Sequence, residues 1–218
     1  MNWKHIRRVP WLDTRARFVS GVPSGGSLLD LGSSDGETLC HFRELRPDLR
    51  LFATDLVGAP ENYPAGCQFH RGDLQNGKLP WPDGSMDAVT CMQLVEHLHD
   101  LTPLFQETAR LLKPGGSIYI ETPHPKTLLY SSPVLFPFTV NFYDDASHVR
   151  PVPLGVLASQ CRGVGLEPVA GGTARNWLFA ASWPLFWLRK PSRKKYTALV
   201  NWLGWSAFLI ARRPLKAG

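Results

Sequence analysis

Short apolar runs alternate with longer stretches of helical periodicity along most of the chain. Seven of the apolar runs have the length of buried strands: Ser27 to Leu31, Leu51 to Thr54, Gln68 to Arg71, Met86 to Cys91, Ser117 to Glu121, Leu166 to Ala170 and Ala207 to Ala211. Helical patterns lie between them at Glu37 to Leu45, Leu101 to Leu112 and Pro153 to Cys161. This alternation is typical of a parallel sheet with crossover helices. We therefore predict an α/β fold with a seven-stranded, mostly parallel sheet and helices on both faces.

Glycine and proline mark the end of the second predicted helix. The sequence Pro114-Gly115-Gly116 follows its last apolar positions. Proline cannot continue a helix, and glycine accepts the positive φ of a helix C-cap. We therefore expect this helix to end at these residues.

Three segments do not follow the alternation. Residues 1–26 are expected to form a helical extension at the N-terminus. Residues 122–153 are rich in proline and aromatic residues and follow the fifth strand, where the loops of open α/β sheets hold substrate contacts. Residues 177–204 form an apolar and basic insertion before the last strand. Because 218 residues are too few for two ordinary domains, we predict a single domain over residues 1–218.

Composition narrows the class of protein. Hydrophobic residues make up 44% of the chain and charged residues 19%, which excludes a disordered protein and a polytopic membrane protein. The four cysteines form no CxxC pair, so neither a disulfide framework nor a zinc ribbon is indicated. Residues 1–30 lack the apolar stretch of a signal peptide. We therefore expect a cytoplasmic protein.

The net charge of +6 belongs to the C-terminal part of the chain. Residues 168–218 hold nine Lys and Arg and no acid, whereas all 18 Asp and Glu precede them. A uniformly basic groove would indicate nucleic acid. Here an anionic partner is expected to meet mainly the residues after 167, and a nucleic-acid partner is not favoured.

A glycine-rich turn directly follows the first predicted strand, in Leu29-Asp30-Leu31-Gly32-Ser33-Ser34-Asp35-Gly36. Backbone N–H groups and the positive end of a helix can approach a ligand closely at such a turn, and a side chain at either glycine would block that approach. The dinucleotide pattern GxGxxG is not met, because Ser34 and Glu37 occupy its second and third glycine positions. A nicotinamide-dependent enzyme is therefore not favoured.

Two further acids follow the next two strands. Asp55 ends the second strand, where a carboxylate can accept both hydroxyls of a ribose. Asp73 follows the third strand, where a carboxylate can accept the amino group of an adenine. Either Asp alone is also explained as a helix or turn cap. Together with Asp30, they place acids at three strand ends, which favours a nucleoside site.

With these residues the chain resembles the class I S-adenosylmethionine-dependent methyltransferases, in particular the ubiquinone and menaquinone biosynthesis type. The resemblance covers roughly residues 27–170 and the last strand, and is also carried by Leu79 to Val89, Gln93 to Leu98 and Leu111 to Gly116. The chain departs from the family at Ser34, where the family usually has glycine. The resemblance implies a Rossmann-like sheet, S-adenosyl-L-methionine as cofactor and S-adenosyl-L-homocysteine as product. It implies a cofactor site made of Asp30, Gly32, Ser34, Gly36, Asp55, Leu56, Asp73, Leu74 and Gln93.

The implied reaction is transfer of a methyl group from a sulfonium to a hydroxyl or carbon of a small or lipid-linked acceptor. Because the leaving group is already cationic, the protein mainly aligns the reactants, and a general base is needed only if the acceptor must lose a proton. An RNA methyltransferase and a non-catalytic module that binds the cofactor are the alternatives. The second would bind the cofactor without methylating any acceptor.

His97 and His148 are the candidate catalytic residues. His97 follows the fourth strand, close to where the family places its acceptor, and His148 lies in a segment that resembles some bacterial members. The alternatives are a site-lining or helix-start histidine at His97, and at His148 a loop brace through Asp144 or Asp145. Glu96 and His97 offer only two ligands, too few for a metal ion, so no metal is predicted.

Two apolar runs flank a basic run within residues 177–204. Neither apolar run reaches the roughly 20 residues needed to cross a bilayer. Tryptophans beside five basic residues are typical of a segment that lies in the interface of an anionic membrane, here its inner face. A lid packed on the sheet is an equal alternative. RNA binding is less favoured, because RNA readers usually combine an accessible aromatic platform with a broad basic face.

Overall fold

Seven strands form one sheet in the structure, a computed structural model that describes residues 6–75, 78–131 and 140–215. The strands are β1 (Ser27–Leu31), β2 (Arg50–Asp55), β3 (Gln68–Arg71), β4 (Met86–Met92), β5 (Leu112–Pro123), β6 (Glu167–Ala174) and β7 (Ser206–Arg212). Their order across the sheet is β3-β2-β1-β4-β5-β7-β6. The pairs from β3 to β5 are parallel, and β7 runs antiparallel to both its neighbours. The predicted seven-stranded, mostly parallel sheet is confirmed.

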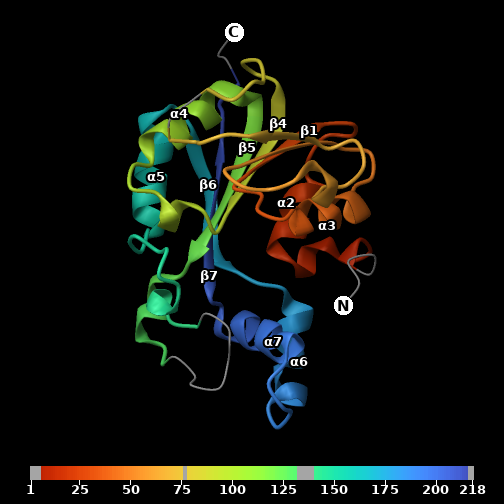
Figure 1. Cartoon of the computed structure of the whole chain (residues 1–218), viewed down its shortest axis with the longest axis vertical. Coiled ribbons are helices and arrows are strands. Elements are labelled where there is room, and N and C mark those ends of the chain that lie inside the picture. Colours follow the sequence, from red (N-terminus) through yellow and green to blue (C-terminus); the bar gives the residue numbers. More distant parts are fainter. Residues whose placement is uncertain (1–5, 76–77, 132–139, 216–218) are drawn as a thin grey trace.

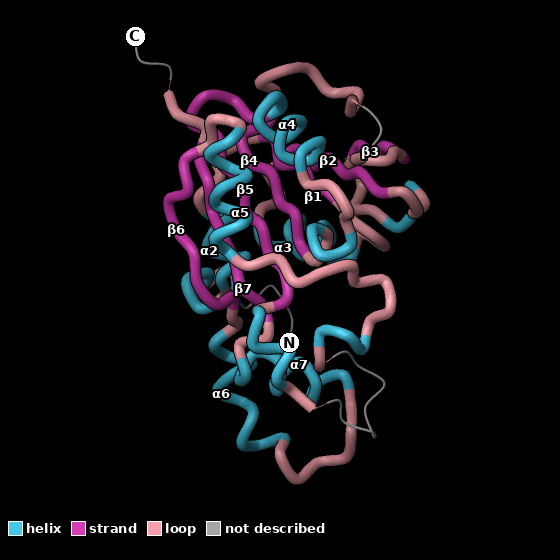
Figure 2. Tube along the Cα trace, turned by 90° about the vertical axis from the view of Figure 1, so that its left-hand side faces the viewer, coloured by secondary structure: helices cyan, strands magenta, loops and turns pink. Residues whose placement is uncertain are grey.

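Helices cover both faces of the sheet (Figure 1 and Figure 2). One face carries α2 (Thr14–Ser20) and α3 (Glu37–Leu45), and the other carries α4 (Thr102–Leu111) and α5 (Leu154–Gly163). Successive residues of β1 point to opposite faces: Leu28 packs in the cluster that contains Phe42 of α3, and Leu29 in the cluster that contains Phe105 of α4. This two-sided burial explains why β1 carries leucines at consecutive positions as well as at alternate ones.

The parallel strands end at the side of the molecule that carries the C-terminal helix pair, α6 (Trp177–Phe186) and α7 (Arg193–Leu203) (Figure 1). From β1 the chain continues to β2 on one side of the sheet, whereas from β4 it continues to β5 on the other. Ligands of open α/β sheets bind at such a switch point, outside the carboxyl ends of the strands. The fold therefore places the candidate site between the sheet edge and this helix pair.

The second predicted helix ends earlier than its sequence indicates. α4 stops at Leu111, and Leu112 is extended because it pairs with Met86 at the start of β4. Gly115 does have a positive φ, +81°, but its N–H donates to the carbonyl of Arg213 beside β5. The expectation that Pro114-Gly115-Gly116 ends the helix is therefore wrong, because strand pairing takes the chain out of the helix first.

The predicted substrate loop is held against the start of β7 in its described part. It contains the short 3-10 helices η4 (Pro125–Leu129) and η5 (Phe142–Asp144), and Trp205 donates its indole N–H to the carbonyl of Val140 at 2.8 Å. Asn141 and Asp144 form a capping box at the start of η5. The loop residues Pro133, Phe136, Pro137 and Phe138 lie outside the described residues.

Candidate active site

The loop between β1 and α3 turns through three residues with left-handed backbone. φ is +72° at Gly32, +49° at Ser34 and +75° at Gly36. A Cβ on Gly32 would lie 2.9 Å from both Cδ atoms of Leu94, the second residue after β4. Gly32 therefore meets two requirements that only glycine fulfils, a left-handed φ and a close approach of another segment.

Asp55 connects the end of β2 to this loop. Its Oδ2 accepts the backbone N–H of Ser34 at 2.8 Å, and its Oδ1 accepts that of Val57 at 2.9 Å. A carboxylate offers about four lone-pair positions, so both oxygens can accept further donors. The structure thus brings the glycine loop and the predicted ribose-binding acid into direct contact.

Asp73 lies at the same edge of the sheet. The N–H of Gly72 donates to the carbonyl of Asp55 at 3.0 Å, which joins the ends of β2 and β3. Asp73 Oδ1 accepts the N–H of Gln75 at 2.8 Å, as in an Asx turn. The cap expected as an alternative therefore exists.

Three further predicted cofactor residues, Leu56, Leu74 and Gln93, differ in exposure. Leu56 is exposed directly after β2, whereas the side chain of Leu74 is buried in the hydrophobic core. Gln93 follows β4 with φ +52°. Its Nε2 donates to Ser206 Oγ at 3.2 Å, but its buried Oε1 has no hydrogen-bond partner within the described chain. Gln93 therefore offers an unused acceptor at the ends of β4 and β7.

Asp30 is buried within β1. Thr90 donates to its Oδ1 at 2.6 Å. Burial raises the pKa of Asp30 to about 7, although the hydrogen bond from Thr90 and the charge of Arg15 act in the opposite direction. A carboxyl group with this pKa is partly protonated near neutral pH, and a cation beside it would favour its ionised form.

An ion pair that the sequence analysis does not identify lies at the same edge. Arg15 of α2 donates to Glu121 of β5 through Nε at 2.8 Å and Nη2 at 2.6 Å, and Tyr119 donates to Glu121 Oε2 at 2.8 Å. The Glu121 side chain is 2% exposed and the Arg15 side chain 34%. The position of Glu121, an acid at the end of an apolar run, is a sequence feature that could have marked it as a functional residue. Nothing in the local sequence marked Arg15 as its partner, 106 residues away.

A cavity of about 540 Å³ separates the sheet edge from α6 and α7. The Arg193 side chain of α7 donates to both oxygens of Glu37 at 2.8 Å, so α7 reaches across to the start of α3. Neither predicted histidine is part of the described lining. The lining residues include Arg15, Glu121, His41, Phe179, Arg193 and Asn201. The cavity has the size of a small-molecule site.

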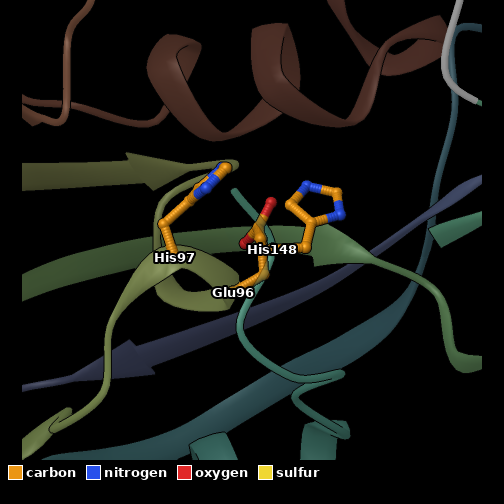
Figure 3. Close-up of side chains that lie close together, drawn as sticks. All are labelled: Glu96, His97 and His148. Atoms are coloured by element: carbon orange, nitrogen blue, oxygen red, sulfur yellow. The ribbon is translucent and has the colours of Figure 1, made fainter. Parts of the chain in front are cut away.

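His97 and His148 come together from segments that are far apart in the sequence. His97 ends the 3-10 helix η3 (Val95–His97) after β4, and His148 follows η5. Their ring centroids are 4.8 Å apart, on either side of the Glu96 carboxylate (Figure 3). The three residues place ligand atoms within 4.8 Å of one another. The expectation of only two metal-ligating residues is therefore wrong, because the fold supplies His148 as a third.

The chain matches a family model described as a methyltransferase domain over residues 3–170. It is 32% identical over 182 residues to a ubiquinone biosynthesis O-methyltransferase of Xanthomonas axonopodis pv. citri, a match that covers 75% of this chain and 73% of that protein. The protein of the same name from Ralstonia nicotianae is 31% identical over 120 residues, which cover 46% of this chain and only 50% of that one.

The fold is similar to that of solved proteins. An S-adenosylmethionine-dependent methyltransferase from Mesorhizobium loti superimposes with a TM-score of 0.64 and 19% identity, over 95% of this chain and 98% of that one. Both chains therefore share one fold over nearly their whole length.

Proposed function

The chain belongs to the family of S-adenosylmethionine-dependent methyltransferases, and we propose that it methylates a hydroxyl or carbon of a small or lipid-linked acceptor. The two relatives described above are named for methyl transfer to oxygen in ubiquinone biosynthesis. When bound, S-adenosylmethionine supplies a methyl group on a sulfonium that leaves as a neutral thioether. The residues of the chain then need only align the reactants and, for a hydroxyl acceptor, remove a proton.

The residues at the sheet edge fit this cofactor. Gly32 keeps the loop backbone open where a Cβ would collide with Leu94, and Asp55 keeps free lone pairs beside the loop. Buried Asp30 favours a cationic group near it, and an amino acid ammonium is such a group. We assign the cofactor site to the residues named from the sequence: Asp30, Gly32, Ser34, Gly36, Asp55, Leu56, Asp73, Leu74 and Gln93.

The observation that carries the proposal is the contact between Ser34 and Asp55. In this contact the Asp55 carboxylate lies beside the turn before α3, which supports Asp55 as the acceptor for ribose hydroxyls. His97 lies at the end of η3 after β4, and His148 lies in the predicted substrate loop; we assign both to the acceptor. The cavity beneath α6 and α7 offers room for a small molecule.

Replacing Asp55 with alanine is expected to weaken cofactor binding strongly. A hydrogen bond to a charged group contributes about 1.5–3 kcal/mol, so loss of two such bonds to a ribose lowers affinity by more than about 100-fold. Isothermal titration calorimetry with S-adenosylmethionine and S-adenosylhomocysteine measures this effect. The control is Glu61→Ala, which removes an exposed carboxylate between β2 and β3 and should leave affinity unchanged. Equal affinity of wild type and Asp55→Ala would contradict the assigned site.

The same preparation separates the alternative functions. Turnover of small or lipid-extracted acceptors supports the proposal. Methylation of RNA alone would favour an RNA methyltransferase. Tight cofactor binding without turnover of any acceptor class would favour a non-catalytic module.

We further propose that α6 and α7 contact the anionic inner face of a membrane and so receive a lipid-linked acceptor. Among the described helices, none is long and apolar enough to cross a bilayer. At the end of α6, however, Trp187 is 64% exposed and Leu188 94%, next to the basic residues of 189–195. In α6 and α7 only Ala180 and Ala198 are buried. A lid packed closely on the sheet would bury more of its side chains. Exposed apolar tips beside basic residues favour a membrane interface.

We expect the protein to float with anionic vesicles and much less with neutral ones. Each basic residue near an anionic surface contributes on the order of 1 kcal/mol to binding. The Trp187→Ser, Leu188→Ser double variant removes apolar contact with the membrane and should lower the bound fraction. Liposome flotation at low and physiological salt measures the bound fraction. Val169→Ser is the control, because Val169 is an exposed apolar residue of β6 outside the helix pair. Recovery of wild type in the soluble fraction with both vesicle types would refute membrane contact.

A further inference from the structure

Glu96, His97 and His148 form a compact group of potential metal ligands. Their ligand atoms all lie within 4.8 Å of one another, and Figure 3 shows the carboxylate of Glu96 between the two imidazole rings. Glu96 and His97 belong to η3, directly after β4, whereas His148 reaches the group from the segment after η5. The N–H of Val149 donates to the carbonyl of Glu96 at 2.8 Å, which holds the two segments together.

The Glu96 carboxylate has one oxygen without a partner. Its side chain is fully buried, and Oε2 accepts the hydroxyl of Thr122 at 3.0 Å. Oε1 is buried and has no hydrogen-bond partner within the described chain. A buried carboxylate oxygen without a partner is unfavourable. A bound cation would satisfy this oxygen.

Hydrogen bonds orient both histidines with Nε2 as the free nitrogen. His148 Nδ1 lies 2.6 Å from the carbonyl of Phe142, so Nδ1 must carry the proton. His97 Nδ1 lies 3.0 Å from Ser147 Oγ, and the Ser147 hydroxyl itself donates to Asp145. Ser147 Oγ therefore accepts the His97 Nδ1–H. Metal-binding histidines are held in this way, with the second ring nitrogen donating to a carbonyl or a similar acceptor.

The surroundings of the group carry negative charge and little solvent. The His148 side chain is only 4% exposed, and its ring centroid lies 4.8 Å from that of His97. Asp145 Oδ2 lies 3.8 Å from His148 Nε2 and adds a second carboxylate beside that of Glu96. The two carboxylates can balance the charge of a divalent ion.

We propose that Glu96, His97 and His148 bind one divalent transition-metal ion. Two imidazoles and one carboxylate suit zinc, iron(II), cobalt or manganese better than magnesium or calcium, which prefer oxygen ligands. Bonds of about 2.0–2.2 Å require the side chains to close in by roughly 1 Å, which the half-exposed His97 can do by rotation. Three protein ligands leave at least one position open, as in catalytic sites.

The open position gives the ion a role in the proposed function. A hydroxyl bound to a divalent ion has a lowered pKa, so an acceptor oxygen could lose its proton to solvent near neutral pH. This role rests on the proposed methyl transfer to oxygen. Ion binding itself does not, because it needs neither cofactor nor acceptor.

The test is a metal titration of the full chain after treatment with a chelator. Cobalt(II) reports on the site through its visible absorption, and zinc is titrated by calorimetry with elemental analysis of the stoichiometry. We expect one ion per chain with a dissociation constant in the micromolar range or below. Glu96→Gln and His148→Gln should weaken binding by more than about 100-fold, since loss of even an outer-shell partner costs 10–100-fold.

His99→Ala is the matched control, because His99 is an exposed histidine two residues from His97 and outside the group. Its affinity for zinc should equal that of wild type. Thermal unfolding identifies any variant that does not fold, and the wild-type titration then still decides the matter. No binding to wild type, or equal binding by wild type and a folded Glu96→Gln, would overturn the metal site. Calorimetry with S-adenosylmethionine on the same chelator-treated protein tests the proposed function separately.

Discussion

The Arg15→Ala variant is expected to lose about 3 kcal/mol of unfolding free energy at neutral pH. Removing one partner of a buried ion pair typically costs about 3–5 kcal/mol, because the remaining charge stays buried without compensation. Glu121 is that remaining charge, almost inaccessible to solvent, and we take the lower value because Arg15 itself is about one-third exposed. Urea denaturation followed by circular dichroism measures the difference.

The defect of Arg15→Ala should depend on pH. Burial alone would raise the pKa of Glu121, but the charge and hydrogen bonds of Arg15 outweigh it and lower that pKa. In wild type this stabilisation is present above the unfolded pKa of about 4.3 and is lost as pH falls through the folded value. Without Arg15, burial raises the pKa, so the carboxyl binds a proton in the folded variant. The defect is therefore expected to shrink between pH 8 and pH 5.

Two variants of α2 separate charge from helix effects. Arg17→Ala removes an exposed arginine from the same helix and should change stability by less than about 0.5 kcal/mol. Arg15→Lys keeps the charge but not the two-pronged hydrogen bond, so it should recover only part of the loss. A loss below 1 kcal/mol in Arg15→Ala, independent of pH, would show that the pair does not stabilise the fold.

The Gly32→Ala variant is expected to bind S-adenosylmethionine at least about 100-fold more weakly than wild type. A left-handed residue with a Cβ costs roughly 1–2 kcal/mol, and here the Cβ also lies 2.9 Å from two carbons of Leu94. Either the Leu94 side chain or the loop must shift, and a shifted loop disturbs the contact between Ser34 and Asp55. Calorimetry measures the affinity, and thermal unfolding confirms that the variant is folded.

Gly66→Ala isolates the backbone contribution. Gly66 has a similar φ, +76°, but a Cβ there would meet nothing within 4 Å. This control should lose stability without losing affinity for the cofactor. The double variant Gly32→Ala, Leu94→Ala removes the collision and should regain part of the binding. Wild-type affinity in Gly32→Ala would mean that the loop between β1 and α3 does not form the cofactor site.

The strands and the glycine loop were predictable because their causes are local. β1, β3 and α3 have the predicted bounds. In β1 the consecutive buried leucines mark a strand covered on both faces, and the left-handed turn before α3 needs glycine. α4 matches the predicted Leu101 to Leu112 to within one residue at each end, but what ends it was not predictable in the same way. There the helix competes with the pairing of Leu112 with Met86, which the sequence around Leu112 does not reveal.

The candidate site also combines features that the local sequence predicts with features that depend on tertiary contacts. The residue pattern was sufficient to identify the family and the cofactor, because the glycine turn and the acids at or near the ends of β1, β2 and β3 are local features of the sequence. It was not sufficient to pair Arg15 with Glu121, or to add His148 to Glu96 and His97. Those contacts join segments separated by 50 to more than 100 residues, and they depend on how loops and helices pack around the sheet edge. Packing also left Trp187 and Leu188 exposed, because burial is a property of neighbours in space and not of neighbours along the chain.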